Sequence, residues 1–281
     1  WIVMKSFYIV TNRDKEGAAE TEREIRAYLE QHGASCASCC LDKSESSYTD
    51  PDQVPEDTDC VITIGGDGTL IQAARDLAGR GIPFIGVNRG HLGYLTQANS
   101  GQALFQMLEA LLNDRYGLEK RMMLSGQVLR RGRPVFQDIA LNEIVISRKD
   151  TLKALHFRIM VNGEFLNNYT ADGMIIATPT GSTAYNLSAG GPIVAPEARV
   201  MVLTPICCHA LNARSIVLGA DDRITVQVEE AGHMAAFDGN PAVPLFPGDQ
   251  ILICQSPLDT VLVQLKKVSF LQNLSSKMTR I

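Results

Sequence analysis

A run of small and hydroxyl-bearing residues follows a short apolar segment in the second half of the chain. The apolar segment is Met174–Ala177, and the polar run begins with Thr180-Gly181-Ser182-Thr183 and ends with Ser188-Ala189-Gly190-Gly191-Pro192. Small residues let a backbone approach a ligand closely, and hydroxyls and free N–H groups can then hydrogen-bond it. Tyr185 adds a flat aromatic face for a base. This composition indicates a loop that grips a nucleotide.

A second glycine-rich loop lies about a hundred residues earlier. The apolar segment Cys60–Ile64 runs directly into Gly65-Gly66-Asp67-Gly68-Thr69, and a helical pattern follows from Thr69. Backbone N–H groups at a helix N-terminus favour anions such as phosphates. The carboxylate of Asp67 would repel a phosphate, so its presence suggests a general base or a magnesium partner. The pentad also occurs in lipid kinases, and therefore indicates phosphoryl transfer more than any one substrate.

The common nucleotide signatures are missing from the sequence. There is no GxxxxGK[ST] loop, no protein-kinase catalytic loop, and no GxGxxG after the first expected strand. These absences disfavour a P-loop enzyme and a conventional Rossmann oxidoreductase.

Taken together, the two loops resemble those of the NAD kinase family, of the bacterial type that uses ATP or polyphosphate. The match covers Asp172-Gly173 and nearly all of residues 180–192, and the pair Asn142-Glu143 stands between the loops as it does in that family. Asp238-Gly239 resembles the turn of a later strand. The resemblance extends over about residues 60–240.

The resemblance implies transfer of the terminal phosphoryl group of ATP to the adenosine-ribose 2′-hydroxyl of NAD, with Mg²⁺ or another divalent cation as cofactor. Asp67 is the candidate base, which would contribute about 10²–10⁴-fold in rate. The expected triphosphate contacts are Gly65, Gly66, Gly68 and Thr69. The expected dinucleotide contacts are Asp67, Gly68, Asn142, Glu143, Lys153, Asp172, Thr183, Ala184, Tyr185, Asn186, Leu187, Ser188 and Asn240.

Two positions depart from the family pattern. Thr170 stands where several relatives have arginine, which suggests that one phosphate contact is missing. Asn240 stands where glutamine is frequent, and its shorter amide would reach less far. Lys153 lies in a variable region where a basic residue could touch the dinucleotide phosphates or be solvated.

Hydrophobic periodicity predicts two domains. Residues 1–118 alternate strand and helix signals, which implies an α/β domain with a parallel sheet, and the segment from about 258 to 281 is expected to pack back on it. Residues 119–257 read as an all-β, sandwich-like domain that binds the dinucleotide. Asn162-Gly163 between two strand patterns is a strong hairpin signal. Because the glycine-rich loops fall in different domains, we expect the ligand between them.

Composition excludes some classes of protein. The 281 residues are 45% hydrophobic and 20% charged, and their formal net charge of −5 argues against a nucleic-acid partner. No apolar run reaches the about 18 residues of a membrane span, and the N-terminal segment lacks signal-peptide features, so we expect no membrane partner. Seven cysteines, an odd number, favour reduced thiols in the cytoplasm. Family resemblance implies a homo-oligomer, a dimer or a tetramer.

Two other functions stay open. A lipid kinase that shares the GGDGT pentad would need an apolar acyl pocket, which residues 172–192 do not suggest. A dinucleotide sensor without catalysis would keep the same pocket, although the presence of Asp67 argues against it. The sequence does not decide between NAD and NADH, or between ATP and polyphosphate.

Overall fold

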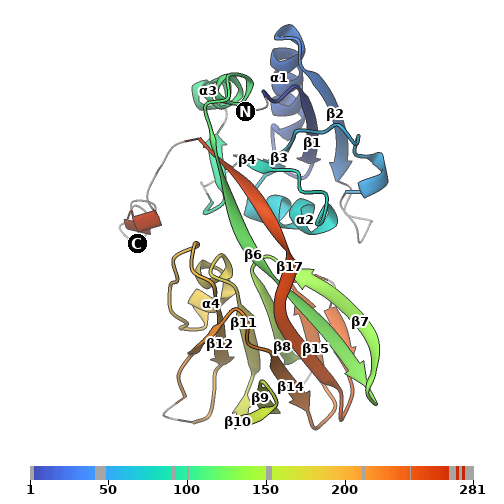
Figure 1. Ribbon diagram of the computed structural model, residues 1–281, viewed down its shortest axis with the longest axis vertical. Helices are drawn as coiled ribbons and strands as arrows, with labels where there is room; N and C mark the ends of the chain where they lie inside the picture. The colour runs from blue at the N-terminus through green and yellow to red at the C-terminus, as the bar shows by residue number, and fades with distance from the viewer. Residues whose placement is uncertain are drawn as a thin grey trace. The chain divides into compact units, whose positions relative to one another are not determined.

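The computed structural model describes residues 3–41, 49–89, 93–99, 101–149, 154–210, 213–240, 242–265, 270–271 and 274–275 (Figure 1). The chain divides into two compact units, which we call unit 1 (Trp1–Lys120 with Asp259–Ile281) and unit 2 (Arg121–Leu258). Strands β6 (Gly117–Arg130) and β17 (Gln250–Gln264) each continue from one unit into the other. We describe the units separately.

Unit 1 contains a parallel sheet. Its strands are β1 (Ser6–Asn12), β2 (Ser35–Leu41), β3 (Cys60–Gly65), β4 (Phe84–Asn88) and β5 (Thr96–Asn99). They are ordered β4-β3-β1-β2, with β5 beside β4, and the end of β17 pairs in parallel with β4 through Leu262 and Phe84. The α/β domain with a parallel sheet that the sequence predicted is therefore confirmed.

Three helices cover the two faces of this sheet. The helices are α1 (Ala18–Gln31), α2 (Asp67–Asp76) and α3 (Gln102–Leu112). The buried residues of α1 and α3 form one apolar cluster with alternate residues of the strands, such as Ile62 and Ile64. Among the described residues, α2 contributes none to this cluster although it contacts β3 and β4, so it lies on the opposite face. It begins two residues before the expected Thr69.

Unit 2 is built from two antiparallel sheets. One sheet has the order β10-β9-β14-β17, and β6 pairs with both β17 and β7. Its further strands are β7 (Arg133–Ala140), β9 (Leu155–Val161), β10 (Glu164–Ala171) and β14 (Ile224–Val228). The other has the order β13-β12-β11-β8-β15-β16, made of β8 (Glu143–Arg148), β11 (Gly173–Ala177), β12 (Val200–Ile206), β13 (Ile216–Gly219), β15 (His233–Phe237) and β16 (Ala242–Leu245). The short helical turns η2 (Gly181–Thr183) and α4 (Tyr185–Ser188) lie between β11 and β12, and a third, η1 (Pro51–Gln53), belongs to unit 1.

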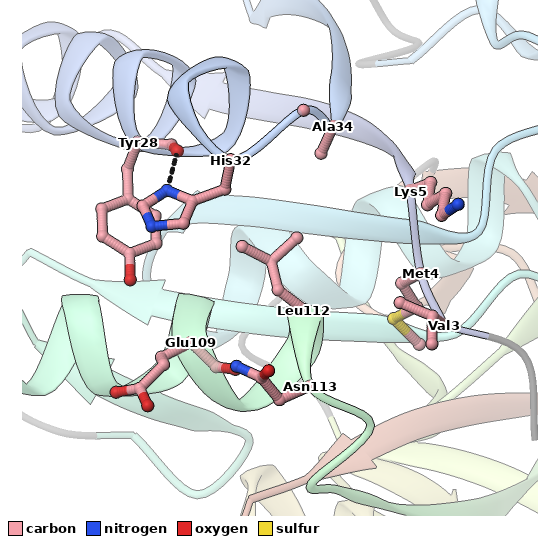
Figure 2. A pocket seen from close by; sticks show the side chains of 10 residues that line it. Val3, Met4, Lys5, Tyr28, His32, Ala34, Glu109, Leu112 and Asn113 are labelled. Atoms are coloured by element: carbon pink, nitrogen blue, oxygen red, sulfur yellow. Dashed lines mark hydrogen bonds between the residues drawn. The ribbon is translucent and has the colours of Figure 1, made fainter.

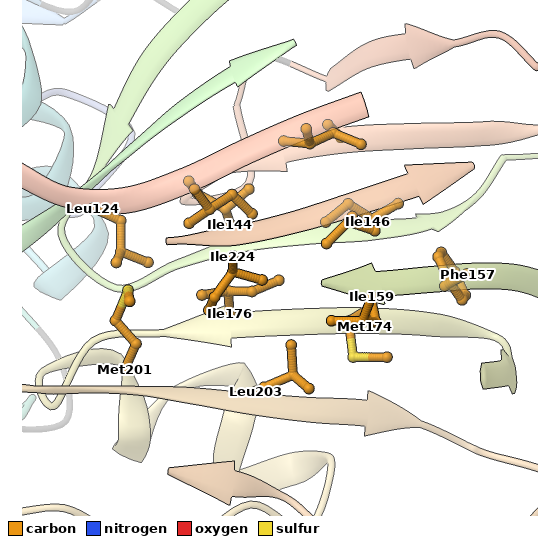
Figure 3. Packing of buried hydrophobic residues seen from close by; sticks show 14 of the residues in the cluster. Leu124, Ile144, Ile146, Phe157, Ile159, Met174, Ile176, Met201, Leu203 and Ile224 are labelled. Carbon is orange, nitrogen blue, oxygen red and sulfur yellow. The ribbon is translucent and has the colours of Figure 1, made fainter. Parts of the chain in front are cut away.

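A shared apolar core joins the two sheets of unit 2. Figure 3 shows side chains of β8, β11 and β12, among them Ile146, Ile176 and Leu203, facing side chains of β9 and β14 such as Ile159 and Ile224. All of these residues are completely buried. The arrangement confirms the predicted β-rich, sandwich-like domain.

One hairpin appears as the sequence predicted, whereas two expected strands are one continuous strand. β9 and β10 are joined at Asn162-Gly163, and both turn residues have positive φ (53° and 83°), as a type I′ turn requires. The sequence pattern predicts two strands, at 250–254 and 261–264, but β17 runs unbroken from Gln250 to Gln264. The polar segment between them, with its Ser-Pro pair, reads as a turn, yet Ser256 and Thr260 are buried in the strand. Of the polar loop expected at 42–59, residues 42–48 lie outside the described residues.

The core of unit 2 makes a stability prediction. Leu203→Ala should lower the free energy of unfolding by about 2–5 kcal/mol, because it removes completely buried methyl groups and leaves a cavity. Leu252→Ala, at a position that is 37% exposed on β17, is the matched control and should cost under about 1 kcal/mol. Urea unfolding followed by circular dichroism measures both. Equal losses would contradict the assignment of Leu203 to the core.

Candidate functional site

The first glycine-rich loop joins the carboxyl end of β3 to the first turn of α2. Gly65 is required by packing, since a Cβ there would lie 2.3 Å from the hydroxyl of buried Thr69. Gly66 and Gly68 differ, because a Cβ at either would meet no atom within 4 Å among the described residues. Packing therefore does not explain these two glycines. Close approach of a ligand to the N-terminus of α2 would explain them.

Asp67 is the first residue of α2, and its carboxylate is held by the loop that follows β4. One oxygen accepts the N–H of Tyr94 at 2.6 Å, and the other accepts the N–H groups of Leu95 and Thr96 and the Thr96 hydroxyl at 3.1–3.2 Å. A Cβ at Gly93 would lie 1.9 Å from the same carboxylate. These donors fix the carboxylate in position. To act as a base it must exchange one of them for a substrate, a rearrangement common when an enzyme binds its ligand.

In unit 2 a second aspartate holds a second backbone segment. Asp238 follows β15 with a positive φ of 49° and forms a turn with Gly239. Its carboxylate accepts the N–H groups of Leu141, Asn142 and Glu143 at 2.7, 2.8 and 3.0 Å. The Asp238 N–H donates in return to the Glu143 carbonyl at 3.0 Å. Asp238 therefore sets the conformation of the Asn142-Glu143 pair.

Hydrogen bonds also connect the second glycine-rich loop to residues 141–142. The N–H of Thr178 donates to the carbonyl of Asn142 at 2.8 Å, and the Thr178 hydroxyl donates to that of Leu141 at 2.6 Å. A Cβ at Gly181 would lie 2.1 Å from the Asn142 carbonyl oxygen. Asn142-Glu143 and the loop from Thr178 are thus one assembly, although they are 36 residues apart in the sequence (142 to 178).

Asn186 supports this loop from within. It is completely buried, and its side-chain amide donates to the carbonyls of Ser182 and Pro192 at 3.1 and 3.0 Å. Its amide oxygen accepts the hydroxyl of Thr204 at 2.7 Å. A ligand contact through this side chain would require the network to break. The structure therefore gives the Asn186 side chain a supporting part.

The short helix α4 presents other predicted residues outward. Thr183 and Ala184 precede it and are half-buried, and the Thr183 hydroxyl donates to the carbonyl of Thr180 at 3.3 Å. Asn240, after the Asp238 turn, is also exposed. The residues of α4 that are open to a ligand are Tyr185, Leu187 and Ser188.

Glu143 has the most perturbed chemistry in this assembly. Its side chain is 8% exposed, and its Oε2 is buried with no hydrogen-bond partner among the described residues. Burial, reinforced by the nearby charge of Asp238 and opposed by the N–H of Tyr185, raises the pKa of Glu143 to about 8. An unpartnered polar atom at this depth is costly unless something else satisfies it.

Asp172 lies between β10 and β11 and is half-buried. Its carboxylate forms an ion pair with Arg148 at 3.2 Å, and its backbone bonds to Ile206 and Arg148. Thr170, one of the departures from the family pattern, lines a neighbouring pocket of about 470 Å³. Arg214 lines the same pocket, so the pocket that Thr170 lines also contains a cationic side chain. Lys153 lies outside the described residues.

Comparison with known proteins identifies the family. The ATP-NAD kinase N-terminal domain matches residues 7–116, and the ATP-NAD kinase C-terminal domain matches residues 141–265. This chain belongs to the NAD kinase family. It is 44% identical to an NAD kinase of Lachnospira eligens, with 98% of this chain and all of the relative covered, and 41% identical to one of Symbiobacterium thermophilum, with 98% and 99% covered.

Solved structures of NAD kinases share the fold. An NAD kinase from Archaeoglobus fulgidus in complex with ATP superposes with a TM-score of 0.78 at 25% identity, over 99% of this chain and all of that one. A yeast NADH kinase in complex with NADH superposes with a TM-score of 0.86 at 24% identity, over 99% of this chain and 89% of that one.

Arg121 also belongs to the assembly, although the sequence pattern did not predict it. Arg121 is 8% exposed in β6, and its guanidinium donates to the hydroxyl of Thr180 at 3.4 Å, at the start of the loop typical of NAD kinases. A charged residue directly before the apolar run Met122–Leu124 was the available signal. Its partner lies 59 residues away in the sequence, so spacing could not reveal it.

Unit 1 contains a pocket of about 430 Å³ that no residue of the glycine-rich loop lines. Figure 2 shows the side chains around it. Its lining includes Lys5, just before β1, and Ala34, just before β2. The rings of Tyr28 and His32 also line it and stack with 4.2 Å between their centroids. These positions mark the amino ends of the parallel strands, whereas Gly65 ends β3 at the carboxyl edge. Ligands of open α/β sheets bind at the carboxyl edge, so this pocket is not the candidate site.

The described residues contain no group of three or more His, Cys, Asp or Glu side chains arranged to hold a metal ion. The carboxylate of Asp67 is already occupied by four donors. The described side chains thus do not form a metal cage of their own.

None of the helices in the described ranges is both long and apolar enough to cross a bilayer.

The raised pKa of Glu143 predicts a pH-dependent stability. The pKa of Glu143 is about 4.5 in the unfolded chain and about 8 in the folded protein. The bound proton therefore contributes its full stabilisation of the folded state below pH 4.5, and this contribution is lost as the pH rises to about 8. Glu143→Gln should therefore be more stable than the unchanged protein at pH 8 and should lose that advantage toward pH 5, by at most about 1.4 kcal/mol per pH unit. Urea unfolding at pH 5, 6.5 and 8 measures the difference, and a constant gap would contradict a buried neutral acid.

Proposed function

We propose that this protein transfers the terminal phosphoryl group of ATP to the adenosine-ribose 2′-hydroxyl of NAD, giving NADP. The observation that carries the proposal is Asp67 at the N-terminus of α2, between two glycines whose Cβ positions are open. Such a start to a helix suits a triphosphate, and a fixed carboxylate beside it suits an alcohol that must lose a proton. The NAD kinase relatives and the ATP complex of the archaeal NAD kinase support this function.

We assign the donor triphosphate to Gly65, Gly66, Gly68 and Thr69. The first turn of α2 offers its free N–H groups, and the helix dipole favours the negative charge. Thr69 is buried, and its hydroxyl accepts the amide of Asn12 at 3.4 Å, so its part is to hold the turn. The open backbone at Gly66 and Gly68 is where phosphate oxygens would approach.

We assign the dinucleotide to the assembly in unit 2. The exposed ring of Tyr185 offers a surface for a base, and the hydroxyls of Thr183 and Ser188 can bond the ligand. Glu143 and Asp172 offer carboxyl groups to ribose hydroxyls or an amide. Asp238 and Thr178 hold the backbone of Asn142, and its side-chain amide is the group proposed to bond the ligand. The further proposed contacts are Asp67, Gly68, Lys153, Ala184, Leu187 and Asn240. Asn186 is proposed to act through the loop that its side chain supports.

Mg²⁺ is the proposed cofactor, and it would be bound by the phosphates of ATP, which is how proteins often hold this ion. When bound, it offsets negative charge on the transferring group. The chain's own residues then have three tasks: to align the triphosphate, to place the ribose hydroxyl, and to accept its proton at a carboxylate oxygen of Asp67.

We also expect the protein to act in the cytoplasm as a homo-oligomer, a dimer or a tetramer. All seven cysteines are free thiols, which suits a reducing compartment. The oligomer is an expectation from the family, and sedimentation of the purified protein measures it.

Asp67→Asn should lower turnover at least a hundredfold, because the amide accepts no proton and its nitrogen cannot accept the N–H groups that the carboxylate accepts. NAD should still bind, because its proposed contacts in unit 2 are unchanged. The measurement is NADP formation from NAD, Mg²⁺ and ATP, together with calorimetric binding of NAD. Diacylglycerol replaces NAD in a parallel assay, because the lipid-kinase alternative predicts incorporation there.

Thr96→Val is the control for a purely structural effect of Asp67. It removes the hydroxyl that donates to Asp67 but leaves the carboxylate. We expect turnover to fall less than tenfold. Near-normal turnover in Asp67→Asn, or an equal loss in both variants, would refute the base assignment.

Gly66→Ala tests the triphosphate assignment. The new methyl group meets no described atom within 4 Å, and Gly66 has an ordinary φ of −117°, so the melting temperature should stay within a few degrees. The KM for ATP should rise about tenfold or more, because the methyl group occupies space meant for the phosphates, while the KM for NAD stays unchanged. A rise in the KM for NAD alone would contradict the assignment.

A further inference from the structure

Arg89 follows β4 at the carboxyl edge of the sheet in unit 1, and its side chain is half-buried. Its Nε donates to the carbonyl of Glu16 at 3.1 Å. No carboxylate among the described residues forms an ion pair with its guanidinium. Charged groups that are taken out of water are usually paired with an opposite charge. A bound anion would supply that charge.

The order of the strands indicates where an anion would bind in unit 1. β3 lies between β4 and β1, with Gly65 opposite Asn88 and Ile64 opposite Thr11. The chain proceeds from β1 to β2 on one side and then from β3 to β4 on the other, so the strand order reverses between β1 and β3. Open α/β sheets bind their ligands at the carboxyl ends of the strands at such a point.

Arg89 crosses the end of β3 at this point. Its backbone N–H donates to the carbonyl of Gly65 at 3.0 Å, and its guanidinium extends to Glu16 in the loop after β1. Gly17 leaves room for the guanidinium, because a Cβ there would lie 1.9 Å from the Nη2 atom of Arg89. The side chain therefore connects the loops after β4 and β1, beside the glycine-rich loop that begins at Gly65.

Stability of the fold does not explain the positive charge of Arg89. Gly17 is the N-cap of α1, and no side chain caps this helix. The N-terminus of a helix favours negative charge, so the helix dipole opposes a guanidinium at Gly17. A neutral amide could donate the same hydrogen bond to the Glu16 carbonyl. The charge itself needs another explanation.

The proposed phosphoryl donor provides one. A triphosphate carries several negative charges, yet residues 65–69 contain no lysine or arginine, and Asp67 adds a further negative charge. Sites of phosphoryl transfer combine metal ions with cationic side chains to offset such charge. Arg13 and Lys15 in the loop after β1 are exposed, so water and salt screen them. Arg89 is half-buried, and its planar fork suits phosphate oxygens.

We propose that Arg89 binds the triphosphate of the phosphoryl donor through its Nη atoms, while its Nε stays on the carbonyl of Glu16. The identity of this ligand as ATP rests on the proposed function. Arg89 is then a binding residue outside the glycine-rich loop, and it supplies the positive charge that the loop lacks. Because the contact is to phosphate, its loss should weaken binding of the donor and leave binding of NAD in unit 2 unchanged.

The experiment measures NADP formation by the full chain with Mg²⁺, and calorimetric binding of inorganic tripolyphosphate and of NAD. Arg89→Gln removes the charge but keeps a donor for the Glu16 carbonyl. The KM for ATP and the Kd for tripolyphosphate should both rise about tenfold or more, as expected for lost charge-assisted hydrogen bonds. The Kd for NAD should stay within about threefold, because its proposed contacts in unit 2 are unchanged.

Two further variants complete the comparison. Arg115→Gln is the matched control, because it removes one positive charge from an exposed pair with Glu109, which lines the pocket at the amino ends of the strands. All constants should then stay within about twofold. Arg89→Lys keeps the charge without the planar fork, so the KM for ATP and the Kd for tripolyphosphate should rise only about threefold.

Three results would overturn the inference. They are an unchanged Kd for tripolyphosphate in Arg89→Gln, an equal rise in Arg115→Gln, and an Arg89→Lys variant as impaired as Arg89→Gln. Circular dichroism checks that each variant is folded, and if Arg89→Gln is not, an unchanged Kd in Arg89→Lys takes its place. If the unchanged protein formed no NADP, the proposed function would fail, whereas binding of tripolyphosphate would still test the contact with Arg89.

Discussion

In each unit, the surroundings of the glycine-rich loop depend on a carboxylate that accepts several backbone N–H groups. Asp67 holds residues 94–96 after β4, and Asp238 holds residues 141–143 before β8. Neither held segment is regular structure for its whole length, so its N–H groups need acceptors from elsewhere. A single aspartate side chain accepts three of these N–H groups, and the negative charge of the carboxylate strengthens each hydrogen bond. Loss of either aspartate would free a loop as well as a charge.

The two loops use glycine for two different reasons. At Gly65, Gly93 and Gly181 a Cβ would collide with another part of the protein, so these glycines let segments of the chain pack together. At Gly66 and Gly68 no described atom lies within 4 Å of a Cβ position, and the ligand contact proposed above would explain these glycines. A glycine-rich sequence does not distinguish these cases. Only the neighbours brought in by the fold separate the scaffold from the contact surface.

Local features of the chain could be predicted from the sequence, and long-range partners could not. The Asn162-Gly163 hairpin, the strand before Gly65 and the helix after it follow from patterns within about ten residues. The continuity of β17 did not, since its polar middle is stabilised by burial rather than by its own preference for a strand. The donors to Asp67 lie 27–29 residues away, and Asn186, expected at the ligand, is buried by Thr204 and Pro192. Residue type indicates what a side chain can bond, and the fold decides what it does bond.

Asp238 and Glu143 show most clearly that residues of the same type differ in chemistry when the fold gives them different surroundings. Both are acidic, and they exchange backbone hydrogen bonds, yet their surroundings differ: Asp238 receives three N–H donors, whereas Glu143 lies on an apolar face with one oxygen unpartnered. Donors stabilise charge and burial opposes it, so the three N–H donors suit a charged Asp238, whereas burial raises the pKa of Glu143 to about 8. If both acids were ionised, their mutual repulsion would destabilise the site.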